Sequence, residues 1–578
     1  MAWCEPRKSR EHEPRWHLLP TYHIKAPRGW LNDPCAPGYD VATGTYHLFY
    51  QWNPKSCDWG DICWGHLTSQ DGVRWTYNGS EPVLQPSMPY DKEGIFTGCL
   101  YPSGVLGEQN QLTIVYSSIC YLPISWTKPY RRNCAGLAAA VSKDAGRTWQ
   151  KQGANPFLAG EPDGLDVIGF RDPYLAAWPA MDEIRGKKSL YGVISGGFPN
   201  EGGTVFLYAV EPDGLLKWEY LGPPLQRPLR FCPNRRWGAD FGANWECASF
   251  MTLKDGSEEC DFLIFGTEGG LKRGHNLGDK DCFQGWCLWM GGGLQHNDIK
   301  MQYEFGGLLD HGCFYAPSSY EHPLEKTRIV WGWIKEEDIS LERREIKGWT
   351  GYLSLPRELF YHLIPNVIGA LKTPLDEIGS VRILKNDGKE TNTLQTLGIR
   401  PLRSLETLRH FPAKEWVGLR SSAKAHGTMF LTNSTSWELE AVISIPTPPI
   451  RIGFHIQHNS TLTKQTTIYF DTAAEAIIVD RSLSNAEDDI RKDILQGAFT
   501  LFTTAENGVV ELEKLRFRIF GDGDVVELFV NDRFALSTLA YSDASECTGL
   551  SCFMQGDGSK HAVFESIKLW DIKDKVVT

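Results

Sequence analysis

The chain has 578 residues, of which 42% are apolar and 22% are charged, a composition typical of globular proteins. Its net charge of −12 is spread without a basic run, which argues against nucleic acid or an anionic membrane surface as a partner. No apolar stretch approaches the length that spans a bilayer, so we expect no membrane segment.

Residues 1–20 are charged and contain no apolar core of the kind found in secretory signal peptides. The 15 cysteines are an odd number at irregular spacings and form no paired zinc pattern. We therefore expect reduced, structural thiols, no metal site and a cytoplasmic protein, or a secreted one if a signal peptide has been removed. Whether the chain forms a homodimer stays open.

The next notable stretch covers residues 29–37 and places a carboxylate between an amide and a proline, just after a tryptophan. Pro34 favours an extended backbone at Asp33, and Asn32 offers both a hydrogen-bond donor and an acceptor beside it. Two prolines and two nearby glycines predict an irregular segment of the kind that carries function on a rigid scaffold. The alternative is an ordinary turn with a solvated Asp.

Short aromatic and β-branched runs, bounded by turn residues, predict strands up to about residue 355, and long amphipathic helical patterns are nearly absent. These runs are residues 46–50, 112–116, 190–195, 204–210, 261–265 and 328–334.

A local motif repeats within this part of the chain. Residues 69–75, 142–149 and 211–218 each place an Asp-and-Gly turn before a Trp, with a period of about 70 residues. A unit of this size fits a four-stranded blade, and about five such units precede residue 355, which predicts a β-propeller. Unrelated hairpins that share a common turn remain the alternative.

After residue 356 the pattern changes. Residues 359–371 form an apolar connector, partly helical in our prediction, and the strands that follow alternate apolar and polar residues as in a β-sandwich. We therefore predict an all-β protein with a five-bladed β-propeller catalytic domain (1–357), a linker (358–375) and a β-sandwich (376–578). The predicted sandwich strands are residues 437–445, 450–457, 466–470, 515–520, 525–530 and 562–570.

Three carboxylates lie in stiff, aromatic or proline-flanked settings, each in a different predicted blade: Asp33, Asp172 and Glu246. Innermost propeller strands converge on one axis, so the three can meet in one funnel, and paired carboxylates suit glycoside cleavage. Trp245 would raise the pKa of Glu246 by desolvation, and Arg171 would hold Asp172 ionised. The alternatives are a surface ion pair for Arg171 and Asp172, and an exposed strand position for Glu246.

With these motifs in order, the sequence resembles glycoside hydrolase family 32, which contains invertases, inulinases and fructosyltransferases, over almost the whole chain. The resemblance implies a five-bladed propeller followed by a β-sandwich. It rests on residues 30–34, 49–54, 59–60, 64–69, 94–98, 170–173, 245–247, 315–316 and 349–352.

By this resemblance, Asp33 is the nucleophile that forms a fructosyl-enzyme, Glu246 is the general acid/base, and Asp172 stabilises the transition state through sugar hydroxyls. The reaction is a double displacement with retention, and it needs no metal or organic cofactor. The residues implied to line the fructosyl pocket are Asn32, Gln51, Trp59, Phe96, Thr97, Arg171 and Trp245.

Two positions depart from the family pattern. Cys35 follows Pro34 where most hydrolytic members have Asn, and Thr97 stands where Ser is usual. The Asp-Pro-Cys variant resembles a fungal branch that includes strong transfructosylating enzymes. We therefore expect a β-fructofuranosidase that acts on sucrose, with substantial fructosyl transfer to kestose-type fructooligosaccharides.

Other functions stay open at this point. A fructan hydrolase of the inulinase or levanase type shares the same motifs, and an arabinan-cleaving propeller shares the three carboxylates. A sialidase is suggested by residues 142–149, which fit an Asp-box turn, but sialidases need an Arg cluster and a Tyr nucleophile. A sugar-binding propeller without activity is the non-enzymatic alternative; it is disfavoured because all three acidic positions are filled.

Overall fold

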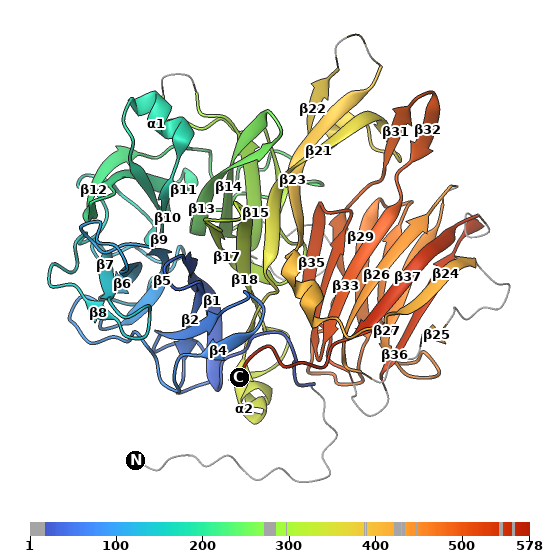
Figure 1. The fold of residues 1–578 in the computed structure, drawn as a ribbon, viewed down its shortest axis with the longest axis horizontal. Helices are drawn as coiled ribbons and strands as arrows, with labels where there is room; N and C mark the ends of the chain where they lie inside the picture. The colour runs from blue at the N-terminus through green and yellow to red at the C-terminus, as the bar shows by residue number, and fades with distance from the viewer. Residues whose placement is uncertain are drawn as a thin grey trace.

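Two lobes of β-sheet make up the computed structural model: a propeller from the first part of the chain and a sandwich from the last (Figure 1). The predicted all-β class, a β-propeller followed by a β-sandwich, is confirmed. None of the described helices is long and apolar enough to cross a membrane. The structure describes residues 18–270, 285–295, 298–386, 388, 390–420, 429–430, 434–446, 449–542, 547–557 and 561–578.

The propeller sheets follow one another along the chain, each an antiparallel meander. The first contains β1 (Gly29–Asp40), β2 (Thr45–Asn53), β3 (Cys63–Ser69) and β4 (Trp75–Tyr77), and β19 (Trp349–Thr350) pairs in parallel with β1. The second contains β5 (Gly94–Tyr101), β6 (Leu112–Ile119), β7 (Ala135–Ser142) and β8 (Gln150–Lys151).

The third and fourth sheets have the same order. The third contains β9 (Gly169–Ala177), β10 (Leu190–Phe198), β11 (Gly202–Glu211) and β12 (Gly214–Gly222), with helix α1 (Pro179–Arg185) between its first two strands. The fourth contains β13 (Asn244–Asp255), β14 (Glu258–Glu268), β15 (Trp286–Gly292) and β16 (Phe305–Leu308).

A larger sheet follows and leads towards the sandwich. It contains β17 (Phe314–Glu321), β18 (Arg328–Ile334), β20 (Tyr352–Leu353), β21 (Arg357–Ala370), β22 (Arg382–Lys385), β23 (Asn392–Pro401), β31 (Phe502–Glu506) and β32 (Val509–Leu512). Helix α2 (Leu341–Lys347) lies between β18 and β19 in the chain, and short 3₁₀ turns cover Leu375–Glu377 and Arg403–Leu408.

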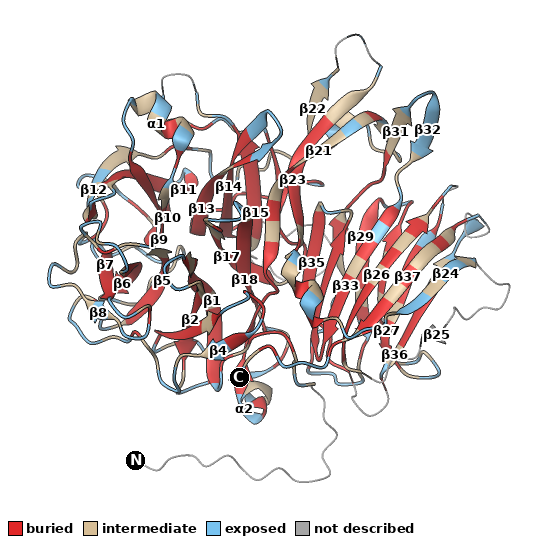
Figure 2. Ribbon diagram, in the orientation of Figure 1, coloured by how far each residue is buried: buried red, intermediate tan, exposed pale blue. Residues whose placement is uncertain are grey.

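Two further six-stranded sheets of the described chain form the sandwich, and their apolar faces pack into one core. One contains β24 (Lys414–Arg420), β37 (Val563–Asp571), β26 (Ser436–Ser444), β33 (Leu515–Asp522), β34 (Val525–Val530) and β35 (Phe534–Leu539). The other contains β25 (Met429–Phe430), β36 (Gly549–Gln555), β27 (Arg451–His458), β28 (Gln465–Asp471), β29 (Ala476–Leu483) and β30 (Leu495–Ala498). Figure 2 shows buried residues along the inner strands of both lobes, whereas β32 is mostly exposed.

Each predicted strand falls on a strand of the structure, and the repeated motif has one structural role. Its three copies join the third strand to the fourth in the first three sheets, at β3–β4, β7–β8 and β11–β12. In the second copy, Asp144 accepts the backbone N–H of Thr148, and the Trp149 indole donates to the Gly146 carbonyl. The motif is therefore a turn that positions the outermost strand of a sheet.

Two local predictions need correction. Residues 29–37, which we expected to be an irregular segment, belong to strand β1, although two register shifts interrupt its pairing with β2. The connector that we expected to be a partly helical linker over 358–375 is a strand up to Ala370, because β21 pairs with both β18 and β23. The domain limits at 357 and 376 stay predictions.

Buried ion pairs join the two lobes. The Arg357 guanidinium donates to Asp310 of the propeller at 2.9 Å and to Glu527 of the sandwich at 2.5 Å. His23 lies between Asp522 and Glu527, each ring nitrogen 3.0 Å from a carboxylate oxygen, with both side chains of each pair fully buried. The described residues that precede β1 are thereby fixed to the sandwich.

Candidate active site

Strands β1, β5, β9, β13 and β17 contact one another in a closed ring around the propeller axis. Each is interrupted by a register shift against its neighbour, and a bulge of this kind leaves a residue unpaired and re-aims its side chain. The shifts fall between Leu31 and Pro34, between Ile95 and Gly98, around Asp172, between Glu246 and Ser249, and between Tyr315 and Ser318. The acidic residues predicted from sequence lie at three of these bulges.

Asp33 is held by three neighbouring side chains. Its Oδ2 accepts hydrogen bonds from Thr97 Oγ1 at 2.6 Å and Gln51 Nε2 at 3.1 Å, and its Oδ1 accepts one from Asn32 Nδ2 at 3.1 Å. Gln51 also accepts from Asn32 and donates to Thr97, so the three side chains support one another. The predicted neighbours of Asp33 are therefore brought together around its carboxyl group.

Asp172 adopts a left-handed backbone conformation, with φ of 63°, at the bulge of β9. Its backbone N–H donates to Ser117 Oγ at 2.7 Å, and its Oδ2 accepts the backbone N–H of Cys247 at 3.2 Å. The Cys247 thiol lies 3.5 Å from Asp33 Oδ2 and 3.6 Å from Asp172 Oδ2. The thiol thus lies between the two carboxyl groups.

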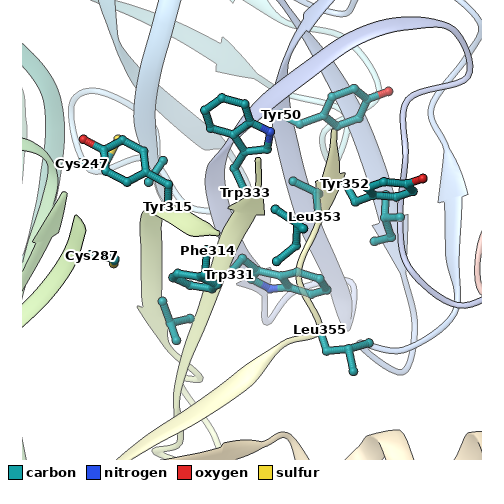
Figure 3. Close-up of a cluster of buried hydrophobic side chains, with 14 of the residues drawn as sticks. Tyr50, Cys247, Cys287, Phe314, Tyr315, Trp331, Trp333, Tyr352, Leu353 and Leu355 are labelled. Atoms are coloured by element: carbon teal, nitrogen blue, oxygen red, sulfur yellow. The ribbon is translucent and has the colours of Figure 1, made fainter. Parts of the chain in front are cut away.

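Glu246 is fixed at both of its carboxyl oxygens. Arg171 donates to Oε1 through Nε at 3.2 Å and Nη2 at 2.6 Å, and the Tyr315 hydroxyl donates to Oε2 at 2.6 Å. Arg171 Nη2 also donates to Glu268 at 2.9 Å. Figure 3 shows Tyr315 beside Cys247, at one edge of an aromatic cluster that includes Trp333.

Two predictions about these neighbours are wrong. Arg171 forms an ion pair with Asp172 at 3.9 Å, but it does not hold Asp172 ionised, because burial and the charges of Glu246 and Asp33 raise the Asp172 pKa by more than Arg171 lowers it. The guanidinium makes its closer contacts to Glu246 and Glu268. The Trp245 side chain has no exposed surface: it stacks on Phe265 with centroids 3.9 Å apart, so it lies in the core and not in the pocket. Alternation along β13 explains this placement, because consecutive side chains point to opposite faces of a strand.

The remaining predicted pocket residues are two aromatic side chains. Trp59 is 47% exposed, and its ring lies edge-on to the buried Phe96 ring with centroids 5.9 Å apart. Phe96 is part of the β5 bulge, next to Thr97. An exposed aromatic edge beside polar groups is suited to contact with a sugar.

Burial decides the electrostatics of the pocket. Burial, with a smaller contribution from the charge of Glu246, raises the pKa of Asp33 to about 6 against the opposing effect of the Thr97 hydrogen bond. The pKa of Asp172 is also raised, by burial and by the nearby Glu246 and Asp33, against the opposing charge of Arg171. Burial likewise raises the pKa of Glu268.

Three residues of the site were not among the predicted site residues. Tyr315 was noted only as part of a motif, Cys247 only as the neighbour of Glu246, and Glu268 not at all. Glu268 ends strand β14 without any distinctive flanking pattern, and it joins the site because its strand pairs it with Asn244, which donates to it at 2.8 Å. Within the described chain, no group of three or more His, Cys, Asp or Glu residues is placed to hold a metal ion.

Paired carboxylates at the axis of a β-propeller, with fixed hydrogen-bond donors around each, define a glycoside hydrolase. The comparisons agree with this class. The family model for the N-terminal domain of glycosyl hydrolases family 32 matches residues 23–366, and the model for the C-terminal domain matches residues 404–571. The chain belongs to this family, as the sequence motifs indicated.

Among solved structures, a β-fructofuranosidase of Aspergillus kawachii has a TM-score of 0.84 and 27% identity, covering 97% of this chain and 95% of that one. A fructosyltransferase of A. japonicus has a TM-score of 0.84 and 25% identity, with 96% of each chain covered. Among curated proteins, a β-fructofuranosidase of Daucus carota is 26% identical over 96% of this chain and 88% of its own length. A cell wall β-fructofuranosidase of Zea mays is 30% identical over 62% of this chain and 56% of its own length.

Proposed function

We propose that this chain is a retaining β-fructofuranosidase that cleaves sucrose through a fructosyl-enzyme and passes a large share of the fructosyl groups to sugar acceptors. One observation carries the proposal: Asp33 of β1 and Glu246 of β13 lie on strands of the same ring, and the thiol of Cys247, the residue after Glu246, is 3.5 Å from Asp33 Oδ2. Each carboxyl group is held by its own hydrogen-bond donors. This is the arrangement that a double displacement needs.

In the first step, the Asp33 carboxylate attacks the anomeric carbon of the fructosyl group while Glu246 gives a proton to the glycosidic oxygen, and glucose leaves. In the second step, Glu246 takes a proton from water or from a sugar hydroxyl, which attacks the same carbon and frees Asp33. Asn32, Gln51 and Thr97 orient the nucleophile through the hydrogen bonds given above.

Asp172 has a supporting role in this scheme. Its Oδ2 accepts from the backbone and thiol of Cys247, whereas its Oδ1 accepts no hydrogen bond from the described residues. We assign Oδ1 to the fructosyl hydroxyls, where a hydrogen bond that strengthens as the oxocarbenium-like charge develops lowers the barrier. Trp59 and Phe96 would contact the sugar at the pocket mouth.

The nucleophile is tested by Asp33→Asn. We expect at least a thousandfold loss of sucrose turnover, about 4 kcal/mol in barrier height, with the thermal unfolding midpoint within a few degrees of the parent protein. Asp163→Asn is the matched control, because its side chain is fully exposed. Turnover within tenfold of the parent enzyme would exclude Asp33 as the nucleophile.

Fructosyl transfer is tested by product analysis in concentrated sucrose. Hydrolysis releases glucose and fructose in equal amounts, whereas transfer keeps fructose bound in oligosaccharides, so we expect free glucose well above free fructose. The similarity to a fructosyltransferase supports this expectation. Equal amounts of the two sugars would indicate that the enzyme hydrolyses sucrose without fructosyl transfer. A higher kcat/KM on inulin than on sucrose would indicate a fructan hydrolase.

A further inference from the structure

A cavity of about 230 Å³ lies along the propeller axis and continues from the floor of the active site. Thr97, Asp172 and Cys247 border it at the active-site end, and the ring strands continue around it. Glu321 and Arg328 line it where β17 ends and β18 begins. Because one water occupies about 30 Å³ in the liquid, the cavity has room for several waters and a small ion.

Arg328 is a buried cation without a carboxylate partner. Its residue is 6% exposed, its Nη1 donates to the Tyr174 hydroxyl at 2.8 Å, and its buried Nε has no acceptor. It forms no ion pair with any residue that the structure describes. The other buried arginines of the described chain differ: Arg171 and Arg357 each bind at least two carboxylates, and Arg481 binds Asp338.

The acidic groups at the two ends of the cavity do not neutralise Arg328. Glu321 lies opposite Arg328 in the β17–β18 register, but its carboxylate is 44% exposed and pairs with Lys326 at 3.3 Å. Asp172 borders the far end, and its raised pKa favours the neutral carboxyl. An arginine guanidinium carries a positive charge in proteins.

We propose that this axial cavity binds a small inorganic anion, chloride in size and charge, against the guanidinium of Arg328. A buried charge without a counter-charge is costly, and an anion removes that cost without a protein carboxylate. The Tyr174 hydroxyl accepts the Arg328 hydrogen bond, so its own proton is available to the anion. This site is independent of the sucrose-cleaving function proposed above.

The first test measures thermal unfolding of the full chain while chloride replaces gluconate at constant ionic strength. We expect the midpoint to rise by about 1–3 °C and to saturate with chloride concentration, since a ligand of the native state stabilises it by mass action. Arg328→Met should abolish this dependence, whereas Arg147→Met, which removes an exposed arginine, should keep it. No chloride dependence in the parent protein, or an unchanged dependence in Arg328→Met, would overturn the proposal.

The second test needs no variant and therefore decides the case even if Arg328→Met fails to fold. Crystals of the full chain grown with bromide in place of chloride should show an anomalous peak within hydrogen-bond distance of the Arg328 guanidinium. Water alone at that position would refute the site. A peak that is absent when bromide is present at the chloride concentration that saturates the thermal effect would identify an adventitious ion only. That result would also refute the proposed site.

Discussion

Arg171 donates two hydrogen bonds to a single carboxyl oxygen of Glu246, at 3.2 Å from Nε and 2.6 Å from Nη2. The second oxygen of Glu246 is held by the Tyr315 hydroxyl, from a different strand of the ring. Glu246 is therefore positioned from both sides before any substrate arrives. Such preorganisation matters for an acid/base group, because proton transfer requires close and aligned atoms.

Tyr315→Phe should weaken this positioning without changing the shape of the pocket. A hydrogen bond to a charged group contributes about 1.5–3 kcal/mol, so we expect a loss of about 10- to 150-fold in kcat on sucrose with little change in KM. Steady-state kinetics check this prediction. A rise in KM alone, with kcat unchanged, would indicate that Tyr315 contacts substrate and does not orient Glu246.

Glu246→Gln should affect substrates according to their leaving groups. Glucose needs a proton to depart, whereas an activated aryl leaving group does not, so the loss should be at least tenfold larger on sucrose than on an aryl fructoside. Glu268→Gln is the matched control, because Glu268 binds the same guanidinium. That variant should lose activity equally on both substrates; equal losses in Glu246→Gln would contradict the acid role.

Thr97→Ala should move the acid limb of the pH profile. The nucleophile is active when ionised, so activity rises with pH through the Asp33 pKa, which burial raises to about 6. The Thr97 hydroxyl stabilises the carboxylate, and its removal should shift the limb of kcat/KM upward by about one pH unit. Thr97→Ser keeps the hydroxyl and should keep the profile. A shift to lower pH would show that Thr97 does not stabilise ionised Asp33.

His23 should make stability depend on pH. Its pKa is about 9; burial lowers it, but hydrogen bonds and charges from Asp522 and Glu527 raise it by more. The folded protein therefore binds a proton that the unfolded chain releases above its ordinary pKa of 6.5. The resulting stabilisation, on the order of 3 kcal/mol, is complete below pH 6.5 and is lost as pH rises through 9.

Thermal unfolding between pH 6 and 10 measures this effect on the midpoint. His23→Gln should be less stable than the parent protein at pH 6, and the difference between the two should shrink towards pH 10. A difference that stays constant over this range would mean that the proton on His23 contributes nothing.

Trp245→Ala should mainly lower the free energy of unfolding. The indole is fully buried and stacked on Phe265, so its truncation should cost about 3–5 kcal/mol. Trp245→Phe keeps most of the volume and should fold with nearly unchanged KM for sucrose, as measured by kinetics alongside thermal unfolding. A large rise in KM in a stable Trp245→Phe variant would indicate that the Trp245 side chain contacts the substrate.

Much of the architecture could be predicted from local patterns. The apolar run at residues 328–334 and the alternating run at residues 515–520 are strands, and each Asp-and-Gly turn joins the third strand of a sheet to the fourth. The resemblance to a known family identified Asp33, Asp172 and Glu246 because their motifs are contiguous in sequence. These features depend on interactions between near neighbours, which a linear sequence displays directly.

The partners of these residues were decided by the tertiary structure. Arg171 lies closer to Glu246 and Glu268, which strands β13 and β14 place beside it, than to its sequence neighbour Asp172. Trp245 and Glu246 are adjacent in the chain, yet one enters the core and the other the pocket, because the bulge and strand alternation divide them. Glu268 joins the site only through strand pairing. Contacts between distant strands depend on register and packing, and no short stretch of sequence contains that information.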